Sequence, residues 1–124
     1  MIVYDAGALV AAERNQRPMW ALHEATLRRG LSPLVPAAVL AQVWRGGPQA
    51  SLSRLLAGCT ITPLDERTAR ASGALCGRAG SDDVVDASVV VLAQMLDASV
   101  VTGDADDLRR LANTANYSIS LHEV

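Results

Sequence analysis

Short runs of β-branched and apolar residues alternate with longer helix-like segments along the whole 124-residue chain. The predicted strands are Ile2–Tyr4, Leu34–Pro36, Cys59–Thr62, Ser99–Thr102 and Ser118–Leu121. Helical segments separate these runs, and such crossover connections make the strands of a sheet parallel. The sequence therefore predicts a single α/β domain over residues 1–124, in which a parallel sheet of about five short strands lies between two layers of helices.

The segments between the strands predict the helices. Pro18 suits the first turn of a helix that runs to Gly30, and Trp20 and Leu27 are expected to share its apolar face. His23, beside the charged Glu24, is expected at the surface. The other predicted helices are Ala8–Glu13, a segment through Val39 and Trp44 that breaks at Gly46-Gly47-Pro48, Ala50–Ala57, Glu66–Gly77 after an Asp65 cap, a buried helix opened by Asp86, and Asp106–Ala112.

Three aspartates occupy positions where a globular chain is expected to bury them. Asp5 and Asp104 each follow a strand-like run, and Asp86 lies in the first turn of a helix that is apolar on nearly every side. Residues just past the ends of parallel strands converge at the carboxyl edge of the sheet. Clustered carboxylates repel one another, and a divalent cation such as Mg²⁺ or Mn²⁺ would hold them ionised through oxygen ligands.

The composition excludes several other chemistries. All 11 residues counted as Lys or Arg are arginine, so there is no P-loop lysine and no Schiff-base lysine. No GxGxxG fingerprint is present, and two histidines argue against a His-rich zinc site. A net charge of −2 neither requires nor forbids nucleic-acid binding. The missing lysine and the missing DxD after the first strand also count against a phosphatase or receiver-type phospho-aspartate domain.

The sequence favours a cytoplasmic protein. No apolar run reaches the roughly 20 residues that a membrane-spanning helix needs, and no export signal is visible before the first strand. Cys59 and Cys76 do not form a metal-binding spacing, and two small buried thiols in a reducing compartment are expected.

Four motifs in order give the chain a family resemblance: VYDAGALVA around Asp5, VPAAVLAQVWRGG around Gln42, DVVDA around Asp86, and TGDADDL from Thr102 to Leu108. Over nearly its whole length the chain resembles the VapC-type toxins of the PIN-domain family. The resemblance implies a three-layer PIN fold and an Mg²⁺- or Mn²⁺-dependent endoribonuclease, the toxin of a type II toxin–antitoxin system. It also implies a homodimer, an RNA substrate and a VapB-type antitoxin whose C-terminal segment wraps the toxin.

The resemblance also implies roles for individual residues. The first, third and fourth family acids match Asp5, Asp86 and Asp104, and Asp107 matches a further acid found in many members. The second family acid, usually a glutamate, is replaced here by Gln42, which ligates through an amide oxygen but adds no charge and accepts no proton. The alternative reading is therefore a catalytically weakened PIN-fold module that binds RNA or an antitoxin.

Several of these residues have a second reading. Asp5 suits the N-cap of the helix that follows it, and Asp83 is a better N-cap than ligand. One of Asp106 and Asp107 is expected to cap a helix while the other faces the site. Thr102 and Arg45 are candidate RNA contacts, and their alternatives are a strand-end threonine and an ordinary solvated arginine.

Overall fold

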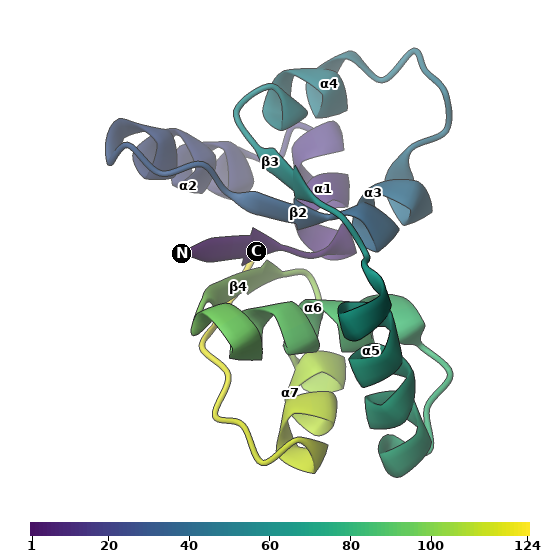
Figure 1. Cartoon of the computed structure of the whole chain (residues 1–124). Coiled ribbons are helices and arrows are strands. Elements are labelled where there is room, and N and C mark those ends of the chain that lie inside the picture. The colour runs from purple at the N-terminus through teal and green to yellow at the C-terminus, as the bar shows by residue number, and fades with distance from the viewer.

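The computed structural model describes all residues from 1 to 124 and forms a three-layer α/β/α domain around a five-stranded parallel sheet (Figure 1). The strands are β1 (Ile2–Tyr4), β2 (Leu34–Pro36), β3 (Thr60–Thr62), β4 (Ser99–Thr102) and β5 (Leu121–Glu123). Their order is β3-β2-β1-β4-β5, so the first strand lies at the centre and all carboxyl ends meet at one edge. The predicted fold class is confirmed.

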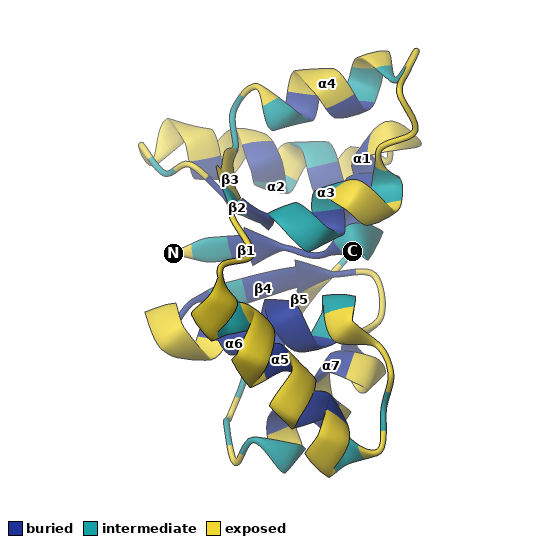
Figure 2. Ribbon diagram, turned by 45° about the vertical axis from the view of Figure 1, so that its right-hand side comes forward, coloured by how far each residue is buried: buried dark blue, intermediate teal, exposed yellow.

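Helices cover both faces of the sheet, as Figure 2 shows above and below the strands. One layer contains α1 (Ala6–Glu13), α2 (Arg17–Arg28) and α4 (Ala50–Leu56), with α1 against β1 and β4. The other contains α5 (Glu66–Ala79), α6 (Val84–Leu96) and α7 (Ala105–Thr114), with α6 against β2 and β4. Helix α3 (Ala37–Val43) contacts both α1 and α6, so it borders the carboxyl edge of the sheet. None of the helices is long and apolar enough to cross a lipid bilayer.

The core consists mainly of alanine, valine and leucine side chains. Val3 and Tyr4 of β1 are fully buried, as are Val89 and Val90 of α6. The middle of α6 is therefore buried as predicted, whereas Val84 at its start and Met95 and Leu96 in its last turn are exposed. With no phenylalanine in the chain, the two helical layers approach the sheet through alanine, valine and leucine.

Element boundaries shift by a few residues where tertiary contacts set them. Strand β5 begins at Leu121 rather than Ser118, because its pairing partner is the segment Val100–Thr102 of β4. Cys59 does not belong to β3, since its backbone N–H and its thiol still bond back to carbonyls of α4. Helix α5 passes Gly77 and ends at Ala79, where the left-handed Gly80 caps it. The thiol of Cys76 is buried and that of Cys59 is half-buried.

The prediction that His23 lies at the surface is wrong. His23 is 3% exposed and is hydrogen-bonded through Nδ1 to the hydroxyl of the buried Tyr4, at 2.8 Å. Leu27, expected on the buried face of α2, is 40% exposed instead. The buried positions of the helix are Met19, His23 and Thr26. Burial of the His23 imidazole is favourable because Tyr4 of β1 provides a hydrogen-bonding partner.

Candidate functional site

The carboxyl ends of β1 and β4 bring Asp5 and Asp104 to the same edge of the sheet. The two strands are adjacent and parallel, with Tyr4 opposite Val101, and the Asp5 N–H extends the ladder to the Val101 carbonyl at 3.1 Å. Asp5 is therefore the first residue past β1, and Asp104 is the second past β4. The sequence analysis predicted that Asp5 and Asp104 lie at one edge of the sheet because they follow parallel strands, and the pairing of β1 with β4 confirms this.

Asp5 is 6% exposed and caps α1, with Oδ1 accepting the Ala8 N–H at 2.9 Å. Burial raises the pKa of its carboxyl, and hydrogen bonds from the Thr102 hydroxyl and from backbone N–H groups oppose that rise. Because a carboxylate has two oxygens with several lone pairs, the cap does not prevent Asp5 from ligating a metal. The capping reading is confirmed, and the ligand reading stays compatible with it.

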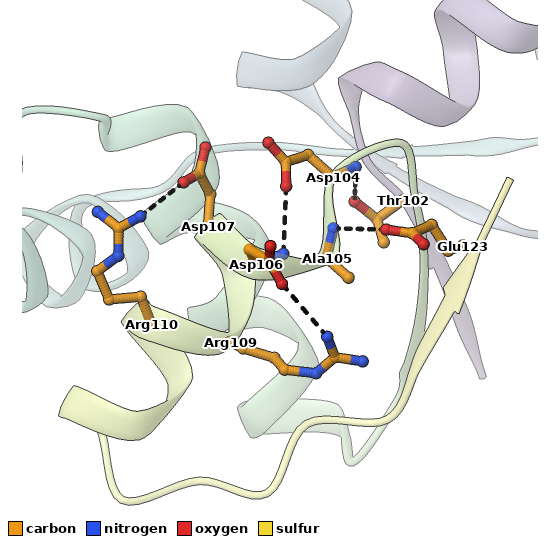
Figure 3. Close-up of polar contacts among 8 residues, drawn as sticks. All are labelled: Thr102, Asp104, Ala105, Asp106, Asp107, Arg109, Arg110 and Glu123. Carbon is orange, nitrogen blue, oxygen red and sulfur yellow. Dashed lines mark hydrogen bonds and ion pairs between the residues drawn. The ribbon is translucent and has the colours of Figure 1, made fainter.

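Thr102 and Asp104 form a local hydrogen-bonded turn at the start of α7. The Asp104 N–H donates to Thr102 Oγ1 at 3.0 Å, and Asp104 Oδ1 accepts the Asp106 N–H at 3.2 Å (Figure 3). Thr102 is fully buried, so its hydroxyl has no exposed surface through which to contact RNA, contrary to that expectation. Its position instead fixes the backbone that carries Asp104.

The N-cap of α7 is Asp104, and neither Asp106 nor Asp107 takes that role. Figure 3 shows Asp104 and Asp107 pointing to one side of the helix start, while Asp106 turns away to an ion pair with Arg109. The Asp107 carboxylate accepts a hydrogen bond from Arg110 at 3.0 Å. A residue that the sequence reasoning missed also lies here: Glu123 of β5 accepts the Ala105 N–H through Oε1 at 3.2 Å.

Asp86 is the half-buried carboxylate of the group, on the first turn of α6. Its backbone N–H donates to Asp83 Oδ1 at 2.9 Å, which confirms Asp83 as the N-cap. Burial raises the pKa of Asp86 to about 7, with further contributions from the charges of Asp83, Asp5 and Asp107. The charged form of Asp86 is therefore disfavoured both by burial and by the neighbouring carboxylates.

A cavity of about 390 Å³ joins these side chains. Its functional lining consists of Asp5, Gln42, Asp83, Asp86 and Asp104, together with Arg14 and Gln16 at the end of α1. Gln42 projects from α3, so the position of the missing family acid does lie in the site. A second cavity of about 590 Å³ adjoins the first, since Asp83 and Asp86 line both, and it includes Asp107 and Arg110.

Arg45 lies outside both cavities. Its guanidinium donates to the carbonyls of Ala41 and Trp44, at 3.4 and 2.8 Å, and it is exposed beyond the end of α3. This agrees with the alternative interpretation of Arg45 as an ordinary solvated arginine. Arg14, at the C-terminal end of α1, is the arginine that lines the carboxylate cavity. No local pattern marks Arg14, because its position depends on how α1 packs against α3 and the β4–α7 turn.

The atom types of the residues facing the cavity are suited to a hard divalent cation. The donors facing the cavity are carboxylate and amide oxygens, the ligands that Mg²⁺ and Mn²⁺ prefer, and the mutual repulsion at Asp86 is what such an ion would offset. No three acidic, histidine or cysteine side chains are already close enough to enclose an ion. The acids thus share a cavity, and the ion would have to draw their side chains together.

Comparisons with known proteins agree with the fold described above. A family model described as the PIN domain matches residues 2–114. No curated protein sequence matches the chain.

Among solved structures, a chain of VapBC2 from Rickettsia felis bound to a promoter DNA fragment is similar, with a TM-score of 0.76 and 16% identity over 100% of this chain and 99% of that one. A toxin–antitoxin complex from Klebsiella pneumoniae has a TM-score of 0.69 and 17% identity, covering 86% of this chain and 89% of that one. FitAcB from Neisseria gonorrhoeae has a TM-score of 0.64 and 14% identity, covering 99% and 97%. At these identities the likeness concerns the fold.

Proposed function

Since this chain belongs to the PIN-domain family, we propose that it is an Mg²⁺- or Mn²⁺-dependent endoribonuclease and the toxin of a type II toxin–antitoxin pair. The observation that carries the proposal is the single cavity lined by Asp5, Asp86, Asp104 and Gln42. Four segments that are distant in sequence supply these oxygen donors, and packing alone gives no reason to gather them. The proposed ligands are Asp5, Asp86 and Asp104, with Asp107 as a further acid on the adjoining wall.

The chain's own residues would bind and orient the reacting groups. The cap on α1 and burial hold the Asp5 carboxylate in place, whereas Asp104 is exposed and its side chain is held by one hydrogen bond, from the Asp106 N–H. Gln42 would orient a water or a phosphate oxygen through its amide, but it cannot take a proton. A divalent ion bound at this site would supply Lewis acidity toward phosphate oxygens and would lower the pKa of a water molecule.

The amide side chain of Gln42 supports a second candidate function. A site with three carboxylate ligands binds a divalent ion less tightly than one with four, because each carboxylate adds a negative charge. The acids are also not preassembled around an ion. The second candidate is therefore a PIN-fold module that binds RNA or an antitoxin and cuts slowly or not at all.

An RNA cleavage assay separates the two candidates. We expect purified protein to cleave RNA with Mn²⁺ or Mg²⁺ and to be inactive with excess EDTA. Asp86→Asn should abolish cleavage, whereas Asp97→Asn should not. Asp97 is a matched control, since it is an exposed aspartate at the far end of the same helix, in a left-handed conformation that asparagine tolerates. Equal cleavage with EDTA, or by the Asp86→Asn variant, would rule out the proposed site.

We propose a homodimer that pairs with a VapB-type antitoxin in the cytoplasm. The support is the fold likeness to proteins found in VapBC2 and FitAcB, together with exposed apolar side chains such as Trp44, Leu64 and Met95. An antitoxin arginine would compete with the metal ion by presenting its guanidinium to Asp5 and Asp86. A monomeric mass in light scattering at micromolar concentration would refute the dimer. Undiminished cleavage in the presence of the neighbour-encoded protein would refute the pairing.

A further inference from the structure

The two cavities beside α6 adjoin each other and share lining residues. Asp83 and Asp86, at the start of the helix, line both the cavity of about 390 Å³ and the cavity of about 590 Å³. The first extends from Asp86 toward the end of α1, and the second extends from Asp86 toward α7 and the turn around Gly80. A ligand longer than one phosphate group would therefore occupy both sides of Asp86.

Each cavity contains one basic side chain, and the two lie on opposite sides of Asp86. Arg14 is the only cation lining the first cavity, and Arg110 is the only cation lining the second. Arg14 takes part in none of the four ion pairs of the protein, although four aspartates line the same cavity. Its guanidinium is thus available to a ligand. Arg110 is held by Asp107 at 3.0 Å and is still largely exposed.

The chemistry of the lining favours a polyanionic backbone over a folded protein segment. Only two of the nine residues around the second cavity are hydrophobic, and no aromatic side chain lines either cavity. An amphipathic helix would find little apolar surface there, whereas phosphate groups would find a guanidinium at each end. Asp5 is nearly inaccessible, so a phosphodiester must enter the cavity to approach it, which a flexible single strand does more readily than a duplex.

We propose that these cavities form one groove for single-stranded RNA, in which Arg14 and Arg110 contact backbone phosphates on either side of the phosphate that faces Asp5 and Asp86. This inference rests on the proposed nuclease function and adds the path of the substrate. Without a divalent ion the groove carries six aspartates, Asp5, Asp82, Asp83, Asp86, Asp104 and Asp107, against two arginines. RNA binding should therefore require the ion as well as both arginines.

The test is equilibrium binding of a fluorescent single-stranded RNA, with Ca²⁺ in place of Mg²⁺ so that binding is read without cleavage. Arg14→Ala and Arg110→Ala should each weaken binding about fivefold at 0.1 M salt and lower the slope of log K against log salt by about 0.7, the value for one phosphate contact with a single strand. Arg14→Lys should retain most of the affinity. Unchanged affinity and slope in both alanine variants would overturn the proposal.

Matched controls separate phosphate contact from general loss of charge. Arg29→Ala removes an unpaired arginine from the end of α2, as Arg14→Ala does from the end of α1. Arg70→Ala breaks an ion pair with Glu66 on α5, as Arg110→Ala breaks the pair with Asp107. Both controls should bind as the parent does. Full recovery of affinity in an Arg110→Ala/Asp107→Asn double variant would show that Arg110 acts only by neutralising Asp107, and would overturn its role as a contact.

The outcomes also distinguish this inference from the proposed function. Cleavage with Mn²⁺ combined with arginine-independent binding would refute the groove and leave the nuclease intact. Arginine-dependent binding without cleavage would support the groove in a module that does not cut. Absence of both would refute both. Equal affinity for a duplex of the same sequence would refute the single-strand part.

Discussion

Gly7 and Gly103 pack backbone against backbone where α1 meets the turn between β4 and α7. A Cβ atom added to Gly7 would lie 2.6 Å from the Gly103 nitrogen and 2.7 Å from its Cα. Both glycines are close in sequence to an acid of the site: Gly7 follows Asp5 by two residues, and Gly103 directly precedes Asp104. The absence of two side chains therefore sets how closely these carboxylates approach.

Gly7→Ala should destabilise the fold by about 1–3 kcal/mol, because the new methyl group meets backbone that cannot rotate away. It should also weaken Mn²⁺ binding, since Asp5 and Asp104 are pushed apart. Chemical denaturation and metal titration measure the two effects. Gly73→Ala is the control: nothing lies within 4 Å of its added Cβ, and it should stabilise α5 by roughly 0.5–1 kcal/mol.

Gln42→Glu should tighten Mn²⁺ binding roughly tenfold, about 1.4 kcal/mol, and should raise the rate of RNA cleavage. The physical reason is a further negative charge facing the carboxylate cavity from α3. Calorimetric titration of Mn²⁺ and initial cleavage rates provide the measurements. Gln16→Glu adds the same charge elsewhere in this cavity, and Gln94→Glu adds it on the exposed face of α6. If all three variants behave alike, the position of residue 42 has no special role.

Metal binding should stabilise the fold, by about 2.7 kcal/mol when free Mn²⁺ is 100 times its Kd. The ion relieves repulsion among carboxylates in the folded state, and the unfolded chain does not assemble them. Thermal melts with EDTA and with Mn²⁺ check this. Asp86→Asn should melt at a similar temperature in both conditions, and an equal gain in the parent and in this variant would place the ion elsewhere.

In the metal-free protein, the contribution of Asp86 to the free energy of unfolding should fall as pH rises from about 4 toward 7. The pKa of Asp86 is raised from its ordinary 3.8 to about 7, so the unfolded chain releases this proton at a lower pH than the folded protein does. The contribution is fully present below the ordinary value and is lost as pH rises through 7. Denaturation of the parent and of Asp86→Asn across this range isolates the effect: the unfolding free energy of the parent minus that of the variant should fall as pH rises, and a constant value would contradict the prediction.

Tyr4→Phe should cost about 1–3 kcal/mol, because it leaves Nδ1 of the buried His23 without its partner. Urea denaturation measures the loss. Tyr117→Phe is the matched control, since the Ala93 carbonyl that accepts its hydroxyl also accepts the N–H groups of Asp97 and Ala98. That variant should lose much less. Comparable losses would mean that the Tyr4–His23 bond contributes little.

The alternation of strands and helices and the placement of Asp5 and Asp104 follow from local sequence. Short runs rich in β-branched residues form β1, β3 and β4, and parallel strands present the residues after them at one edge. Asp65 and Asp83 likewise cap helices through contacts three residues away in sequence. Such features involve only neighbours along the chain, so a sequence pattern records them.

Tertiary structure alone decided the features that depend on distant partners. His23 is buried because Tyr4, nineteen residues earlier, offers it a hydrogen bond. Strand β5 begins at Leu121 because β4 sets its register, and Arg14 rather than Arg45 lines the cavity because of how α1 packs. The sequence determined which residue types are available at the carboxyl edge of the sheet. Only the packing of segments far apart in the chain determined which of them meet, since local patterns do not encode the energies of those contacts.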